Sequence, residues 1–194
     1  MRVVDQDHPA LYPLFLRVRD KLVLVVGAGA VAEHKVRALL EAGALVRVVA
    51  PTAVDSVAAL AQAGRIQWEV RPFAETDVSS VWLVIAATSD PDVQQRVADA
   101  ASANRVFVVA VDDSSHASAF AGAIVSRPPI MVAISSSGAA PAMSRLIREL
   151  IEDLLPSDEW IAHARRLRAD WRRARVPMGE RFDRLLKEFT RRRE

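Results

Sequence analysis

The sequence contains no cysteine, which excludes disulfide bridges, thiol nucleophiles and zinc sites built on cysteine. Any metal chemistry would have to use His, Asp or Glu side chains. Long hydrophobic runs are also absent, because stretches such as Val81–Ala87 are far shorter than the roughly 18 residues that cross a bilayer. The first nine residues, MRVVDQDHP, hold no apolar signal core, so we expect a soluble protein of the cytoplasm.

Lysine is scarce, with three residues against 23 arginines. Arginine suits bidentate recognition of carboxylates or phosphates, although a GC-rich genome explains the bias equally well. The charge is uneven: residues 157–194 carry 12 basic and 7 acidic side chains, while the rest carries 14 and 17. With 51% hydrophobic and 26% charged residues in 194, the chain is expected to fold as one domain, or one domain with an appendage, and not to be disordered.

Short apolar runs alternate with helical patterns over the first 111 residues. The run Lys21–Gly27 (KLVLVVG) is typical of a strand buried on both faces, and Ala28–Ala42 follows with apolar residues at helical spacing. Short connections between such elements predict an α/β fold, a doubly wound parallel sheet of the Rossmann type with helices on both faces. The further strands are predicted at 45–50, 66–70, 81–88 and 105–111, and the further helices at 54–63 and 92–103.

The pattern changes after the fifth predicted strand. Two more strands are expected at 123–126 and 130–134, separated by Arg127-Pro128-Pro129. A helical pattern begins at Pro141 and ends at Pro156, and two amphipathic helices striped by tryptophan, leucine and phenylalanine follow it. We therefore expect a nucleotide-binding Rossmann domain at 1–113, a small α+β segment at 114–156 and a helical C-terminal region at 157–194.

A glycine motif stands where the first strand meets the first helix. Residues Gly27–Ala32 form the pattern G-x-G-x-x-A. Gly27 permits a tight turn, Gly29 lets the backbone approach a pyrophosphate, and the small Ala32 lets helix and strand pack closely. A phosphate would then lie on the helix N-terminus. The position in the first strand–helix unit favours dinucleotide binding over a plain tight turn.

The acidic residue that usually follows such a motif by about 20 residues and binds the ribose is missing, because the second strand ends in Ala50-Pro51-Thr52. Thr52 or backbone groups are expected to contact the ribose instead. No basic residue stands at this strand end to meet a 2′-phosphate, so NAD is favoured over NADP. Thr88, at the end of the fourth predicted strand, is assigned to the same cofactor site.

Asp112 lies at the carboxyl end of the fifth predicted strand, with Asp113 beside it. Ligands of doubly wound sheets lie outside these strand ends, so the Asp112 carboxylate is a candidate general base. The neighbouring acid or partial burial would raise its pKa toward neutrality. The alternative is that these aspartates only cap the turn. His116 is a candidate acid, base or metal ligand, or a solvated side chain, and no cluster of His, Asp and Glu predicts a metal site.

The segment Ser135–Pro141 (SSSGAAP) leads into a predicted helix. Hydroxyl groups such as that of Ser136, and free N–H groups at a helix start, can hold a carboxylate or phosphate, and Arg145 and Arg148 follow within two turns. The segment is a candidate anion site, and a flexible connecting loop is an equal alternative.

Four segments together resemble a known family. They are VLVVGAGAVAEHKVRALLEAGALVRVVAP, WLVIAATSDPDVQQRV, VAVDD and IMVAISSSGAAPAMSRLIRELIEDLLP. In order and spacing, from about Leu11 to Glu188, the sequence resembles the dehydrogenase and ferrochelatase module of siroheme synthesis. The combination is far more specific than the glycine motif alone.

The resemblance implies a homodimeric enzyme that oxidises precorrin-2 to sirohydrochlorin with NAD as hydride acceptor. Many members then insert ferrous iron, as a substrate, to make siroheme. It also implies that the segment after the nucleotide domain forms the dimer contact and that Asp112 is the general base in both reactions. Ser136 matches a serine that is phosphorylated in some members. The residues implied to line the NAD site are Ala30, Val31, Pro51 and Thr52.

A tetrapyrrole with many carboxylates explains a need for arginines such as Arg127, Arg145 and Arg148 near Asp112. The family's usual threonine and serine before Pro141 are replaced by alanines, which leaves open a dehydrogenase without chelatase activity. Some relatives carry a fused methyltransferase domain; we expect none in this protein, so a separate enzyme is expected to supply precorrin-2. Two other classes are an NAD-binding redox regulator and a nucleic-acid binder; acids interleaved with the tail arginines argue against the second.

Overall fold

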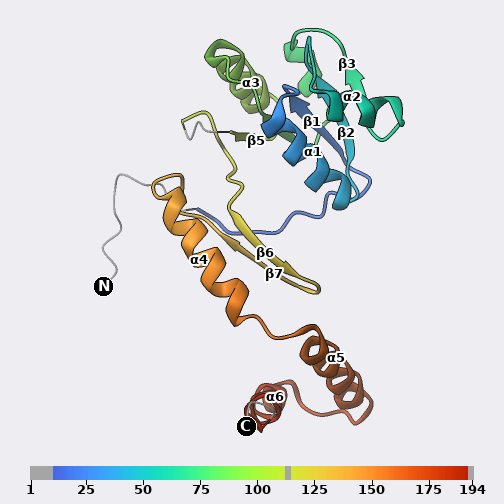
Figure 1. Cartoon of the computed structure of the whole chain (residues 1–194), viewed down its shortest axis with the longest axis vertical. Helices are drawn as coiled ribbons and strands as arrows, with labels where there is room; N and C mark the ends of the chain where they lie inside the picture. Colours follow the sequence, from blue (N-terminus) through green and yellow to red (C-terminus); the bar gives the residue numbers. More distant parts are fainter. Residues whose placement is uncertain (1–10, 112–114, 192–194) are drawn as a thin grey trace. The chain divides into compact units, whose positions relative to one another are not determined.

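The computed structural model describes residues 11–111 and 115–191, so Asp112 and Asp113 lie outside the described residues (Figure 1). The chain forms two compact units. The first extends to Gly122 and includes Ser135–Pro141, and the second comprises Ala123–Ile134 and the chain from Ala142 onward. The domain boundaries expected at residues 113 and 156 stay predictions. In the part of the chain that is described, no helix is long and apolar enough to span a membrane.

The first unit is built on a five-stranded parallel sheet in the order β3-β2-β1-β4-β5, which confirms the predicted doubly wound α/β fold. The order changes direction between β1 and β4, the point where such sheets bind ligands. The strands are β1 Leu22–Val26, β2 Leu45–Val49, β3 Gln67–Glu69, β4 Leu83–Ala86 and β5 Phe107–Ala110. The helices are α1 Ala30–Glu41, α2 Asp55–Gln62, α3 Pro91–Ala103 and the short 3₁₀ helix η1 Glu75–Val78.

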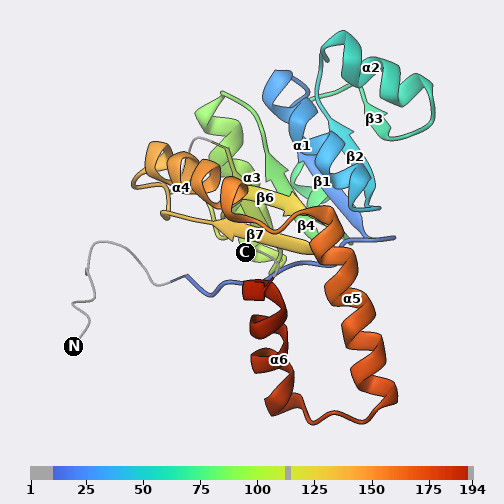
Figure 2. The ribbon, with the colours of Figure 1, turned by 60° about the horizontal axis from the view of Figure 1, so that its bottom comes forward.

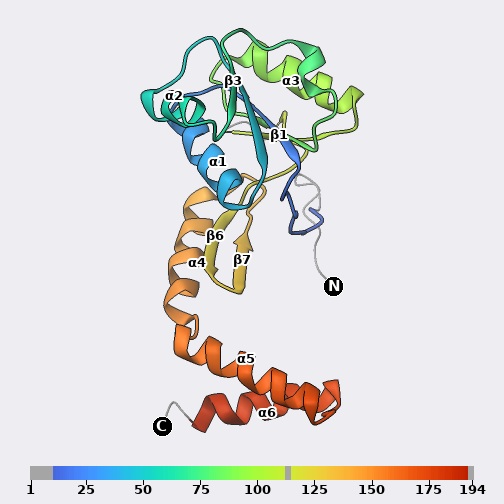
Figure 3. The same cartoon turned by 90° about the vertical axis from the view of Figure 1, so that its right-hand side faces the viewer.

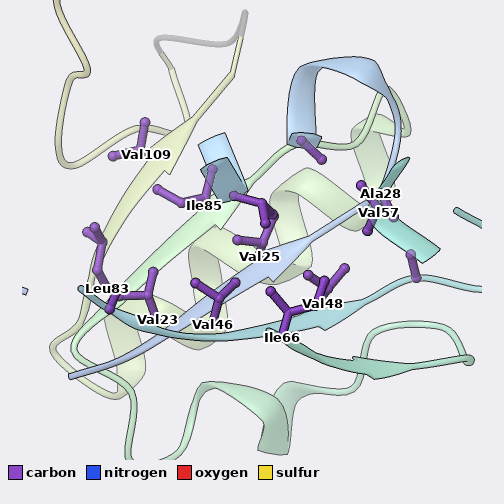
Figure 4. Close-up of a cluster of buried hydrophobic side chains, with 14 of the residues drawn as sticks. Val23, Val25, Ala28, Val46, Val48, Val57, Ile66, Leu83, Ile85 and Val109 are labelled. Atoms are coloured by element: carbon purple, nitrogen blue, oxygen red, sulfur yellow. The ribbon is translucent and has the colours of Figure 1, made fainter. Parts of the chain in front are cut away.

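Both faces of this sheet are buried, because successive side chains of a strand point to opposite faces. Val23 and Val25 of β1 pack with α1 and α2, whereas Leu24 and Val26 pack with α3 and η1. Figure 4 shows the first of these two layers, in which the β1 valines lie beside those of β2 and the aliphatic side chains of β4. Burying each valine side chain stabilises the folded state by about 1.5–3 kcal/mol. This gain explains why a strand that is buried on both faces is continuously rich in valine.

Several elements differ from the predicted boundaries. β4 ends at Ala86 and not at Thr88, because the chain there turns into α3 and the Asp90 carboxylate accepts the first helical N–H groups. β5 begins at Phe107, after Arg105 adopts a left-handed conformation (φ 58°). Arg127, predicted to lie in the turn of the hairpin, is instead the last residue of the first hairpin strand and pairs with Ile130. η1 was not predicted, because four residues show no periodicity.

The second unit holds an antiparallel hairpin and three helices, as predicted. Its elements are β6 Ala123–Arg127, β7 Ile130–Ile134, α4 Pro141–Leu154, α5 Asp158–Arg173 and α6 Met178–Arg191. Figures 2 and 3 show α4 alongside the hairpin, and α5 and α6 as neighbouring helices. Arg127 donates to the carbonyl oxygens of Leu155 and Pro156 (2.8 and 2.9 Å) and so satisfies acceptors beyond the end of α4. The Trp160 ring packs on Phe189 at 5.0 Å and joins α5 to α6.

A buried carboxylate organises the chain between β3 and β4. Arg71 donates to both oxygens of Asp77 (2.6 and 2.8 Å) and also binds Glu69. The backbone N–H of Ala74 donates to the same carboxylate, and Arg47 of β2 donates to the Asp77 carbonyl. Asp77 is 4% exposed, so its charge depends on these partners. The hydrogen bonds from Arg71 hold the pKa of Asp77 below its usual range, against the opposing effect of burial.

Replacing Asp77 with asparagine is expected to lower the free energy of unfolding by about 1–3 kcal/mol at neutral pH, because Arg71 loses its bidentate partner. The native pKa of this carboxyl lies below its unfolded value of about 3.9, so the stabilisation is present above that pH and is lost as the pH falls further. Urea denaturation followed by circular dichroism from pH 7 to pH 2 measures both effects.

The difference between the wild type and Asp77→Asn should therefore shrink below about pH 4. Glu41→Gln, which changes an exposed carboxylate at the end of α1, is the matched control and should leave the curve unchanged. A difference that stays constant down to pH 2 would contradict the assignment of the stabilisation to the ionised pair.

Candidate functional site

The turn between β1 and α1 requires glycine at its first position. Gly27 has φ +103°, which L side chains rarely adopt, and its N–H donates to the Val49 carbonyl at 3.0 Å. A Cβ at this position would lie 2.3 Å from the carbonyl oxygen of Ala87, at the end of β4. The backbone of the turn therefore presses directly on the neighbouring strand, across the change in strand order.

The second glycine of the motif faces open space. Gly29 is the N-cap of α1 with φ −81°, and a Cβ built on it meets nothing within 4 Å. The first α1 residues are exposed; Val31 is 45% exposed. An open backbone surface at a helix N-terminus has the shape and the N–H donors that bind a pyrophosphate. The predicted residues Gly27, Gly29, Ala30 and Val31 thus meet in one place that fits a dinucleotide.

The loop after β2 reaches the same place. The N–H of Val54 donates to the Ala28 carbonyl at 3.0 Å, which joins the loop to the glycine turn. Pro51 and Thr52 are exposed on this loop, and the Trp68 indole N–H donates to the Ala50 carbonyl at 3.0 Å and holds its base. This loop therefore adjoins the glycine turn, and the expectation that Pro51 and Thr52 line the NAD site stays a prediction.

One acidic side chain lies in the first turn of α1, where it would meet the phosphate charge. Glu33 accepts hydrogen bonds from Ser56 and from Arg37, whose guanidinium is 2.7 Å from the carboxylate. The hydrogen bond from the Ser56 hydroxyl, and to a smaller extent the one from Arg37, holds the pKa of Glu33 below its usual range. Arg37 thus offsets a negative charge next to the open helix end.

The ends of β4 and β5 are held together by a side chain that the sequence analysis missed. Gln94 of α3 is 7% exposed, and its amide nitrogen donates to the carbonyl oxygens of Thr88 (2.8 Å) and Val111 (3.4 Å). The N–H of Val111 in turn donates to the Ala86 carbonyl at 3.0 Å. The sequence feature that could have identified Gln94 is its polar side chain at helical spacing from Val97, on the apolar face of α3.

His116 lies against α3. Its Nε2 is 2.7 Å from the amide oxygen of Gln95, and its Nδ1 is 3.3 Å from the Ser115 hydroxyl. It lines a groove of about 550 Å³ along β5, together with Asp99, Arg105 and other residues of α3 and of 115–118. The glycine turn does not line this groove. No group of three or more His, Cys, Asp or Glu side chains that could hold a metal ion occurs within residues 11–111 and 115–191.

The residues of the candidate anion site are divided between the two units of the chain. The hydroxyl of Ser136 accepts the backbone N–H of Ala140 at 3.2 Å, so it serves the turn of its own loop. Arg145 pairs with Glu149 and Arg148 with Glu152, each at 3.0 Å on the surface of α4. Ser136 belongs to the first unit and the two arginines to the second, so their substrate contacts stay predictions.

Known proteins resemble both parts of the chain. A family model described as "Putative NAD(P)-binding" matches residues 14–123, and one described as "Sirohaem biosynthesis protein central" matches residues 129–154. The siroheme synthase of Salmonella typhimurium is 44% identical over 177 residues, which are 90% of this chain and 38% of that protein. The siroheme synthase of Salmonella heidelberg is 43% identical with the same coverage. The chain thus spans about two fifths of these relatives.

The solved structure titled "SirC, precorrin-2 dehydrogenase" has a similar fold, with a TM-score of 0.75 and 23% identity over 91% of this chain and 88% of that one. The fold and the glycine turn define a dinucleotide-binding protein of the Rossmann type. The chain belongs to the NAD(P)-binding family that the first model describes, and its predicted resemblance to proteins of siroheme synthesis is confirmed.

The two glycines should respond differently to alanine. Gly27→Ala is expected to lower the melting temperature and abolish NAD binding, because its Cβ clashes with Ala87 and its φ is strained. Gly29→Ala should keep the melting temperature but weaken NAD affinity about tenfold or more, since its Cβ enters the space for the pyrophosphate. Isothermal titration with NAD and thermal melts measure both, and wild-type affinity in Gly29→Ala would place the cofactor elsewhere.

Proposed function

We propose that the protein is an NAD-dependent dehydrogenase that oxidises precorrin-2 to sirohydrochlorin. The observation that carries this proposal is the glycine turn, pressed on β4 and open at Gly29, in a chain that is 44% identical to siroheme synthases. The reaction converts precorrin-2 and NAD⁺ into sirohydrochlorin, NADH and a proton. The bound cofactor supplies the hydride acceptor.

Asp112 is the proposed general base, which accepts the proton that leaves the macrocycle. It follows Val111 in the sequence, and the Val111 backbone is bonded to Ala86 beside the glycine turn. The Val111 backbone itself lies at the carboxyl ends of β4 and β5, the edge of the sheet where ligands of doubly wound folds lie. Thr88, which follows the end of β4, is proposed to line the same site.

Ferrous iron insertion into sirohydrochlorin is the proposed second reaction. Two pyrrole protons leave as iron enters, and Asp112 is the proposed acceptor for them. Iron is a substrate here, and the macrocycle nitrogens are proposed to supply most of its ligands. Arg145 and Arg148 are proposed to exchange their surface partners Glu149 and Glu152 for substrate carboxylates. Breaking the two surface pairs costs little free energy, because exposed ion pairs are weak.

An anaerobic assay of the purified protein with enzymatically generated precorrin-2 and NAD tests the proposal. Sirohydrochlorin and NADH should form in equal amounts, and added ferrous iron should give siroheme faster than in a protein-free control. Asp112→Asn should lower kcat/KM of both steps by about 10²–10⁴-fold, because a base is lost. Absorbance spectra follow each species.

Asp113→Asn, which changes the adjacent carboxylate, is the matched variant and should keep most of the activity. If Asp113→Asn loses activity and Asp112→Asn keeps it, the base is assigned to the wrong residue. Sirohydrochlorin without acceleration by iron would leave a dehydrogenase alone. NAD binding without any oxidation would favour a redox regulator.

We infer that the protein forms a homodimer through α4. Leucine and isoleucine side chains at helical spacing along this helix are exposed; Leu146, Leu150 and Leu154 are 50%, 55% and 69% exposed. The outer face of the hairpin adds Ile124 and Met131, both 52% exposed. Such a continuous apolar stripe on a helix with a charged opposite face supports burial against a second copy.

Leu150→Lys is expected to shift the protein from dimer to monomer, because it places a charge within the exposed stripe of α4. Glu152→Lys, on the charged face of the same helix, is the matched control and should stay dimeric. Sedimentation velocity at several protein concentrations distinguishes the two states. A monomeric wild type, or a dimer that survives Leu150→Lys, would contradict the interface.

A further inference from the structure

Gln94 is a buried polar side chain at the ends of β4 and β5, beside the proposed site. Its amide nitrogen donates hydrogen bonds to two carbonyl groups from different strand ends. They are the carbonyls of Thr88, after β4, and Val111, after β5. Both carbonyls lie beyond the last residue of their strands, next to the backbone hydrogen bond from the Val111 N–H to the Ala86 carbonyl. The side chain therefore acts as a clasp that extends the pairing of the two strands at the edge where the chemistry is proposed.

The same strand end is restrained from its other neighbour. The Ala87 carbonyl lies so close to Gly27 that a Cβ there would approach it to 2.3 Å, and the Ala87 N–H donates to the Val26 carbonyl at 2.8 Å. Gly27, the Ala87–Thr88 strand end, Gln94 and Val111 thus form one continuous chain of contacts. It connects the cofactor turn to the residue that precedes Asp112.

The amide oxygen of Gln94 has no hydrogen-bond partner in the part of the chain that is described, although it is fully buried. A buried acceptor without a donor is costly, so an apolar side chain of the same size would suit packing alone at least as well. The presence of glutamine at this position is therefore poorly explained by stability and well explained by the two carbonyls that its nitrogen holds.

We propose that Gln94 is a positioning residue, which holds the ends of β4 and β5 at the separation that the hydride and proton transfers require. This inference rests on the dehydrogenase activity proposed above. Gln94 acts through Thr88 and the chain that continues from Val111, and it does not itself exchange a proton. Small displacements of reacting groups cost large factors in rate, so losing the clasp should affect turnover more than folding.

Gln94→Met tests the clasp, because methionine matches the shape of glutamine but has no N–H donor. The melting temperature should stay within about 4 °C of the wild type, since the lost bonds are offset by removal of the unpartnered oxygen. The kcat for precorrin-2 oxidation should fall about 10–100-fold with little change in the KM for precorrin-2. Amide hydrogen exchange in peptides covering 87–90 and 107–111 should speed up.

Gln62→Met makes the same chemical change on the exposed end of α2 and should leave turnover and exchange unchanged. Unchanged kcat in Gln94→Met overturns the proposal, and so does a loss of activity that only follows a matching loss of folded protein. Should the wild type not oxidise precorrin-2, the proposed function fails by itself. Faster exchange at both strand ends and weaker NAD binding in Gln94→Met would still support the clasp, and their absence would overturn it.

Discussion

The site depends on the close approach of Gly27 to the Ala87 carbonyl. This contact is possible only without a Cβ, and it brings the turn after β1 against the end of β4, where the strand order changes direction. Helix α1 then begins with its N-terminus open at Gly29, and the loop after β2 joins the turn through the Val54–Ala28 hydrogen bond. A larger side chain at one position would separate the strands whose ends form the site.

Two buried polar side chains on the α3 side of the sheet show opposite solutions to the cost of burial. Asp77 is satisfied by Arg71 and by the backbone N–H of Ala74, and its network ties the segment between β3 and β4 to the sheet. Gln94 satisfies its nitrogen but not its oxygen. Complete satisfaction is typical of a structural role, whereas the unpartnered oxygen of Gln94 is consistent with the positioning role proposed for this side chain.

Much of the first unit follows from local pattern. The Val-rich run at β1 has to be buried on both faces, and the glycine motif between it and α1 has one geometry that fits. Strand ends are less predictable. Thr88 is a residue type that favours strands, but its hydroxyl accepts the backbone N–H of Asp90 and so belongs to the start of α3. Gln94 was missed for a related reason: its polar character is visible in the sequence, but its two carbonyl partners are 6 and 17 residues away.

In the second unit, the helical pattern of the sequence predicts the helices but not what covers their apolar faces. Trp160 and Phe189 bury part of the apolar faces of α5 and α6 against each other, yet Phe182 remains 69% exposed. Along α4 the apolar stripe is exposed as well, while Arg145 and Arg148 are paired on the charged face. A folded chain gains little from ordering such helices unless their apolar faces are covered. The proposed dimer therefore accounts for the exposed stripe along α4.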